Sequence, residues 1–235
     1  LWNDGGFFPN GLMGFLGGFQ IAFFAFVGIE LVGTAAAETK DPCTTLPKAI
    51  NAIPVRLALF YVLALLAITA VIPWRKVVPG VSPFVSLFGL AGFGAAASVM
   101  NFVLLTAAAS SDNSGLYSTS RMMYGLALDS QAPSRFRKLS SNNVPRNALV
   151  ASCLLLLCGI TFLYTSDSIM QAFALVTTVA ALLFLFTWSL IVVCYIVYRH
   201  KRPQLHNESV YKMPGGVPMC WVVLAFFATS LVILT

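Results

Sequence analysis

Charged residues are scarce in this sequence, and their scarcity excludes an ordinary water-soluble protein. Only 9% of the 235 residues are charged, whereas soluble domains usually carry about 25%. Hydrophobic residues make up 58% of the chain, and the mean hydropathy is +0.85. So few charges cannot cover a surface that faces water. We therefore expect the lipid bilayer to be the solvent for most of the chain.

The sequence also lacks the motifs of a metal site, an enzyme or a nucleotide-driven pump. Its two histidines, His200 and His206, lie in a basic loop that we expect to be solvated, and its five cysteines have no metal-ligand spacing. There is no HExxH pair, nucleophile elbow or GxxxxGK loop. We therefore predict no catalytic residues, no metal and no cofactor. The net charge of +6 would suggest nucleic acid in a soluble protein, but its distribution indicates membrane topology instead.

Six stretches are long and apolar enough to span a bilayer, which takes about 20 mostly apolar residues. We predict spans at residues 12–38, 52–73, 91–127, 147–164, 168–198 and 215–235. The third and fifth exceed the thickness of a bilayer and can tilt. The predicted fold class is an all-α, multi-pass membrane protein. The sequence starts at Leu1 and stops within an apolar run, so we expect it to be a fragment of a longer chain.

Basic residues fall on one side of these predicted spans. The loops 39–58, 121–147 and 199–214 hold twelve of the fourteen Lys and Arg residues, and the opposite side holds only Arg75 and Lys76. Because cytoplasmic loops are enriched in Lys and Arg, we place these three loops in the cytoplasm. We expect the basic residues of the 121–146 loop to set the topology and to contact anionic lipid headgroups.

The first predicted span carries a carboxylate near its middle. Glu30 follows Gly28 by two residues and precedes Gly33 by three. A charge at the bilayer centre costs about 2.5–3.5 kcal/mol or more, so it must face protein or a water-filled cavity. Glycine allows the helix to unwind, and transporters bind substrates and ions at such broken helices. We predict a break near residues 27–29; the alternative is that the glycines pack helices and Glu30 makes a structural hydrogen bond.

Several short motifs occur along essentially the whole chain. They are LWNDGG at 1–6, FVGIELVG at 26–33, ETKDP at 38–42, LPKAI at 46–50, SPF at 82–84, NSG at 113–115, STSRM at 118–122, AP at 132–133 and YKMP at 211–214. In these motifs the chain resembles the amino acid permeases of the amino acid–polyamine–organocation superfamily, and the subgroup that it most resembles is the bacterial D-serine/D-alanine/glycine permeases.

This resemblance implies a LeuT-like fold of two inverted five-helix repeats. The chain would hold the second repeat and one further helix, helices six to eleven, and transport would need the missing N-terminal repeat. The implied activity is import of small neutral amino acids (D-alanine, D-serine or glycine) by proton symport and alternating access in the bacterial inner membrane. The alternatives are a permease of the same superfamily for cationic or aromatic amino acids, or a channel, for which we find no repeated polar motif.

The resemblance also implies roles for residues around the predicted break. Phe24 would close over the substrate as an outer gate, or pack as an ordinary core aromatic. The carbonyls of Val27, Gly28 and Ile29 would accept hydrogen bonds from the substrate ammonium group. Glu30 would either carry the coupling proton or anchor its helix to neighbouring groups.

Further candidates lie in the third and fifth spans. Ser111 and Ser114 share a helix face and would line the pocket or bond another helix. Thr177 would line the pocket or bond its own helix backbone. Asp112 departs from the related permeases, which usually carry a small apolar residue there. If Asp112 faces the pocket, a cationic substrate becomes plausible.

Overall fold

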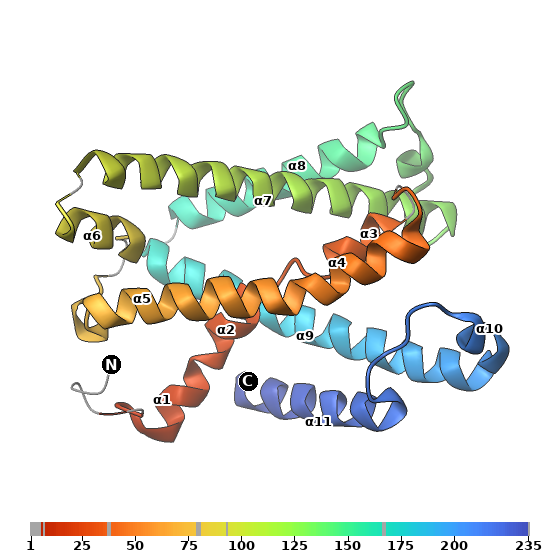
Figure 1. Ribbon diagram of the computed structural model, residues 1–235. Coiled ribbons are helices and arrows are strands. Elements are labelled where there is room, and N and C mark those ends of the chain that lie inside the picture. Colours follow the sequence, from red (N-terminus) through yellow and green to blue (C-terminus); the bar gives the residue numbers. More distant parts are fainter. Residues whose placement is uncertain are drawn as a thin grey trace. The chain divides into compact units, whose positions relative to one another are not determined.

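The computed structural model describes residues 6, 8–36, 39–78, 81–92, 94–165 and 168–234, and all regular elements in these ranges are helices (Figure 1). The described residues form two compact units. The first unit lies within Gly28–Pro42 and Ala49–Ala172. The second unit lies within Trp2–Val27, Cys43–Lys48 and Phe173–Thr235. Most of the motif at 1–6 and Glu38 of the motif at 38–42 lie outside the described residues.

The first unit is built around one long helix. Its helices are α3 (Leu31–Thr34), α4 (Pro42–Leu57, of which Cys43–Lys48 belong to the second unit), α5 (Leu63–Val71), α6 (Pro83–Leu90), α7 (Gly94–Leu128) and α8 (Arg146–Thr165). A π-helical segment, Ala58–Val62, joins α4 to α5. Figure 1 shows α8 running back beside α7, and Ala127 and Ala148 are buried. The Arg137 side chain closes the end of α7 by donating to the carbonyls of Ala127 and Leu128, at 2.7 and 2.8 Å.

The second unit contains the N-terminal and C-terminal helices. They are α1 (Gly11–Gly17), α2 (Phe19–Ala25), α9 (Ile169–Lys201, whose first turn belongs to the first unit), α10 (Pro203–Glu208) and α11 (Gly216–Leu234). Phe23, Ala181 and Leu185 form its buried core, and Phe227 and Trp188 pack against them. Phe23 therefore fixes α2 in this unit.

Three of the described helices are long and apolar enough to cross a membrane, namely Pro42–Val71, Met170–Lys201 and Gly216–Leu234. The first begins at Pro42 because proline is well suited to the first helical turn, where an amide has no helical partner. The predicted span 52–73 covers its apolar part. Gly11–Ala25 and Arg146–Thr161 are shorter apolar helices. The six-span topology therefore stays a prediction.

Large apolar side chains are exposed along these helices. Examples are Leu65 at 62%, Leu155 at 68% and Leu183 at 61% of their full exposure. A soluble monomer rarely exposes so much continuous apolar surface. The exposed faces therefore suit contact with lipid or with other membrane helices.

A buried histidine holds α10 against α9. His206 is only 7% exposed, and its ring lies edge-on to Tyr195 at 5.8 Å and to Tyr198 at 6.4 Å. The expectation of a solvated loop is therefore wrong for His206, because these two tyrosines cover it. Burial lowers the pKa of His206 below its usual 6.5, and the positive charges of Arg199 and Lys212 lower this pKa further.

We expect acid to loosen α10 from α9. Because the pKa of His206 is lower in the docked state than its ordinary 6.5, the undocked segment takes up a proton first as the pH falls below 6.5. Docking should then weaken by at most about tenfold per pH unit. Hydrogen exchange of residues 203–208, corrected for the intrinsic rate, measures this. His206→Phe should keep the ring packing and remove the pH dependence of docking. His200→Gln, the control, should retain this pH dependence. An unchanged pH effect in His206→Phe would contradict the assignment.

Candidate functional site

Helix α2 ends at Ala25, and a turn follows it. Residues 26–30 separate α2 from α3. The amides of Phe26 and Val27 still bond to the carbonyls of Phe23 and Phe24, each at 3.1 Å. Gly28 then has a φ of +104°, which side chains of L-residues rarely adopt. Gly28 therefore ends the helix because it can take a backbone conformation that other residues resist.

The turn leaves one of the three candidate carbonyls open. The Gly28 carbonyl accepts the Leu31 amide at 3.2 Å, and the Ile29 carbonyl accepts the Val32 amide over a long 3.5 Å. No described residue donates a hydrogen bond to the carbonyl of Val27. A carbonyl inside a membrane helix normally has an internal partner. The Val27 carbonyl is therefore available to a hydrogen-bond donor, and the Ile29 carbonyl is weakly held.

The Glu30 carboxylate is tied to the same turn. The Gly28 amide lies 3.2 Å from each of the two carboxylate oxygens and donates to both. Both residues are half-buried. A hydrogen bond to an ionised carboxylate is stronger than one between neutral groups. The negatively charged form of Glu30 therefore stabilises the left-handed conformation of Gly28.

A pair of hydroxyl groups joins α3 to α7 directly after the turn. The Thr34 and Ser118 oxygens lie 2.9 Å apart, although these residues are 84 positions apart in sequence. The Thr34 hydroxyl donates to the Leu31 carbonyl at 2.8 Å. Since a hydroxyl has one proton, Ser118 must be the donor to Thr34. Local sequence patterns do not indicate this pair, because the two hydroxyl groups meet only in the folded chain.

In the second unit, Phe24 lies close to the helical turn that carries Thr177. The half-buried Phe24 ring meets the Phe173 ring edge-on at 6.4 Å. Thr177 is 3% exposed, and its hydroxyl donates to its own helix, 2.9 Å from the Phe173 carbonyl and 3.0 Å from the Ala174 carbonyl. The local bonding that was the alternative for Thr177 is therefore observed. Whether this residue also lines a pocket stays a prediction.

The polar cluster of α7 faces outward in the first unit. Ser111, Asp112 and Ser114 are exposed. Ser114 donates to the carbonyl of Ser110 at 3.0 Å, within its own helix. No described residue forms a hydrogen bond or an ion pair with the Asp112 side chain. These side chains are thus accessible in this chain, and the structure shows no hydrogen bond from the described residues of the turn to them.

The candidate residues are divided between the two units, and the chain passes from one unit to the other between Val27 and Gly28. The second unit holds the aromatic and threonine candidates and the open carbonyl, which belong to Phe24, Thr177 and Val27. The first unit holds the other candidates, which are Gly28, Ile29, Glu30, Ser111 and Ser114.

Known proteins resemble the chain along its whole length. The D-serine/D-alanine/glycine transporter of Escherichia coli (strain K12) is 60% identical over 235 residues, which are 100% of this chain and 50% of the transporter. The DL-alanine permease of Lactococcus lactis subsp. cremoris is 43% identical over 212 residues, 89% of this chain and 45% of the permease. The L-asparagine permease of E. coli (strain K12) is 39% identical over 233 residues, 99% and 46% of the two chains.

The chain spans about half the length of these relatives. No solved structure gives a significant match. The family model for amino acid permeases matches residues 1–235, the entire sequence. The broken apolar helix and the long membrane-capable helices thus belong to a chain that is a member of the amino acid permease family.

Proposed function

We propose that the full-length protein containing this chain imports small neutral amino acids of the D-alanine, D-serine and glycine class. The observation that carries the proposal is the turn at residues 26–30, in which the Val27 carbonyl has no partner among the described residues. An ammonium group has three donors and no acceptor, so it suits a site made of carbonyls. The 60% identity to a D-serine/D-alanine/glycine transporter supports the same substrate class.

In this proposal the substrate ammonium binds at the turn and aromatic residues close over it. The carbonyls of Val27, Gly28 and Ile29 accept its hydrogen bonds. Phe24 acts as the gate, supported by its edge-on contact with Phe173 in the same unit. Thr177, Ser111 and Ser114 form polar parts of the pocket wall.

Neutral substrates are favoured by the chemistry of the candidate residues. Ser111 and Ser114 carry hydroxyls, and the turn offers only backbone carbonyls and Glu30, which already binds the Gly28 amide. None of these groups is a free charged partner for a substrate side chain. Asp112 is the exception, because it is exposed and has no partner among the described residues. A cationic amino acid is therefore the alternative substrate.

Glu30 is the proposed proton carrier. When ionised, its carboxylate accepts the Gly28 amide with both oxygens. A proton would neutralise the carboxylate and weaken this charge-assisted hydrogen bond. Proton uptake would thereby favour a different conformation of the turn, which is what coupling of a proton to alternating access requires.

The proposed architecture is the LeuT-like fold, with this chain supplying the second five-helix repeat and one further helix. The chain spans about half the length of the relatives, which is compatible with one of the two repeats lying outside it. In such folds, substrate binds at broken helices near the bilayer midplane. We place the protein in the bacterial inner membrane, supported by the three membrane-capable helices among the described residues and by the bacterial relatives.

Uptake by the full-length protein in liposomes tests this function. We expect an inward proton gradient to stimulate uptake of labelled D-alanine and glycine, and unlabelled D-serine to compete. Per coupled proton, a gradient of one pH unit can supply about tenfold accumulation. Uptake of arginine or lysine instead would favour the Asp112 alternative. Folded protein that moves no amino acid under any gradient would refute the transport proposal.

A further inference from the structure

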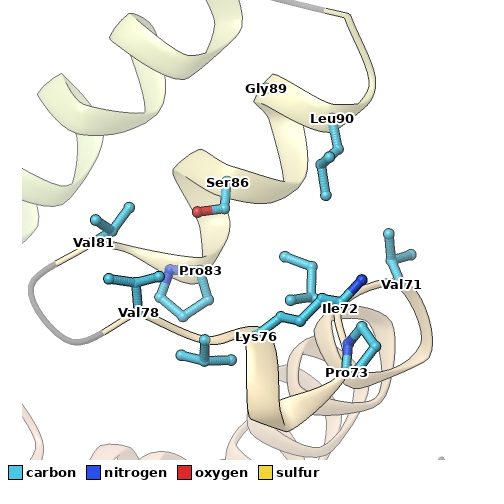
Figure 2. Close-up of a pocket in the computed structure, with 11 residues that line it drawn as sticks. Val71, Ile72, Pro73, Lys76, Val78, Val81, Pro83, Ser86, Gly89 and Leu90 are labelled. Atoms are coloured by element: carbon cyan, nitrogen blue, oxygen red, sulfur yellow. The ribbon is translucent and has the colours of Figure 1, made fainter.

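A cavity of about 600 Å³ lies in the first unit, and its lining includes none of residues 26–30. It is formed by the end of α5, described residues of the loop that follows, and α6. Most of its lining is apolar and includes Val71, Ile72, Val78, Val81, Pro83 and Leu90. In Figure 2, Val78, Val81 and Pro83 lie toward one end of the view, and Val71, Ile72 and Leu90 lie toward the other. Ligand pockets typically measure about 300–1,000 Å³, so the cavity is large enough for a ligand.

Lys76 is the cation among the described residues that line this cavity, and Figure 2 shows its side chain extending toward Ile72. Its ammonium forms no hydrogen bond or ion pair with any described residue. The sequence has no acidic residue between Asp41 and Asp112, so no neighbour along the chain neutralises it. An apolar cavity whose lining includes a cation without a described partner suits an amphiphile with a negatively charged head.

The cavity also lies where a membrane helix ends. Pro42–Val71 is apolar and long enough to cross the bilayer, and the cavity begins with Val71. Trp74 follows directly, and the Arg75 guanidinium lies over its ring at 5.3 Å. Tryptophan is enriched at the level of the lipid headgroups. A headgroup level at Trp74 would place the apolar part of the cavity next to the acyl chains and Lys76 near the phosphates.

We propose that this cavity binds an anionic phospholipid, with part of an acyl chain against the apolar lining and the phosphate at Lys76. The apolar lining recognises the chain, and the unpaired ammonium prefers a lipid of net negative charge to a zwitterionic one. This site is separate from the proposed amino acid site, and its occupation does not depend on which solute is transported.

Photo-crosslinking to the full-length protein in liposomes tests the site. The probes are phosphatidylglycerol and phosphatidylcholine that carry the same photoactivatable acyl chain. Crosslinks are mapped by mass spectrometry. The labelling of Val71–Leu90 is expressed relative to the labelling of α11, because crosslinks to α11 report contact with bulk lipid. We expect phosphatidylglycerol to label Val71–Leu90 about fivefold more than phosphatidylcholine, the preference that one interfacial cation provides.

Two variants separate the roles of charge and volume. Lys76→Gln should remove the preference for phosphatidylglycerol, whereas Arg75→Gln should keep it, because Arg75 lies over Trp74. Gly89→Leu should reduce labelling by both lipids, since Gly89 lines the cavity and a Cβ added there meets no atom within 4 Å. Equal labelling by both lipids in the unmodified protein, or equal effects of Lys76→Gln and Arg75→Gln, would overturn the proposal. So would undiminished labelling in Gly89→Leu.

Discussion

Gly28→Ala should reduce amino acid uptake by about tenfold or more, because a side chain at φ +104° costs about 1–3 kcal/mol. The nearest atom to an added Cβ is Leu31 Cδ1 at 4.0 Å. Steric overlap is therefore absent, and the whole effect comes from the backbone conformation. The alanine would favour a continued helix and so close the Val27 carbonyl into a helical hydrogen bond. Uptake of labelled D-alanine per amount of protein in the liposomes measures the loss.

Gly33→Ala is the matched control for this prediction. Gly33 lies in α3, has no positive φ, and an added Cβ there meets nothing within 4 Å. Alanine favours a helix by up to about 1 kcal/mol over glycine, so this variant should transport normally. If both glycine variants lose uptake equally, the region tolerates no substitution and the left-handed turn is not the cause. If neither loses it, the turn is not part of the transport site.

Glu30→Gln should separate substrate movement from the proton gradient. In the unmodified protein the Gly28 backbone amide donates to both carboxylate oxygens of Glu30. A glutamine side chain keeps one oxygen that can accept this hydrogen bond, but it has no proton to release near neutral pH. We expect exchange of labelled for unlabelled D-alanine to continue, whereas the roughly tenfold accumulation supplied by one pH unit should disappear. Parallel exchange and gradient-driven uptake assays measure the two activities.

Glu30→Ala shows whether the carboxylate also acts as an anchor. Alanine leaves the Gly28 amide without its side-chain acceptor, so both exchange and gradient-driven uptake should fall. Should Glu30→Gln retain the full response to the gradient, the proton is carried elsewhere and the anchor role alone remains. The two variants together thus distinguish the two roles that the sequence left open for this residue.

Short elements and tertiary partners were the features that the sequence pattern did not predict. Helices α6 (Pro83–Leu90) and α10 (Pro203–Glu208) contain only 8 and 6 residues, which is too short for a clear periodic pattern. The burial of His206 was missed because it depends on tyrosines from the preceding long helix. The Thr34–Ser118 bond was missed because it joins residues 84 positions apart.

The sequence alone determined the class of this protein and the neighbourhood of its candidate site. Hydropathy and charge placement depend on which residues occur in each window, so they predict membrane helices without any knowledge of packing. The Gly28–Glu30 pattern is likewise local, since it reflects a missing Cβ and a carboxylate in an apolar segment. Only the tertiary structure decided which carbonyl stays open, what the Glu30 carboxylate binds and where the cavity beside Lys76 lies. These features depend on backbone dihedral angles and on distances between side chains, which composition and spacing do not specify.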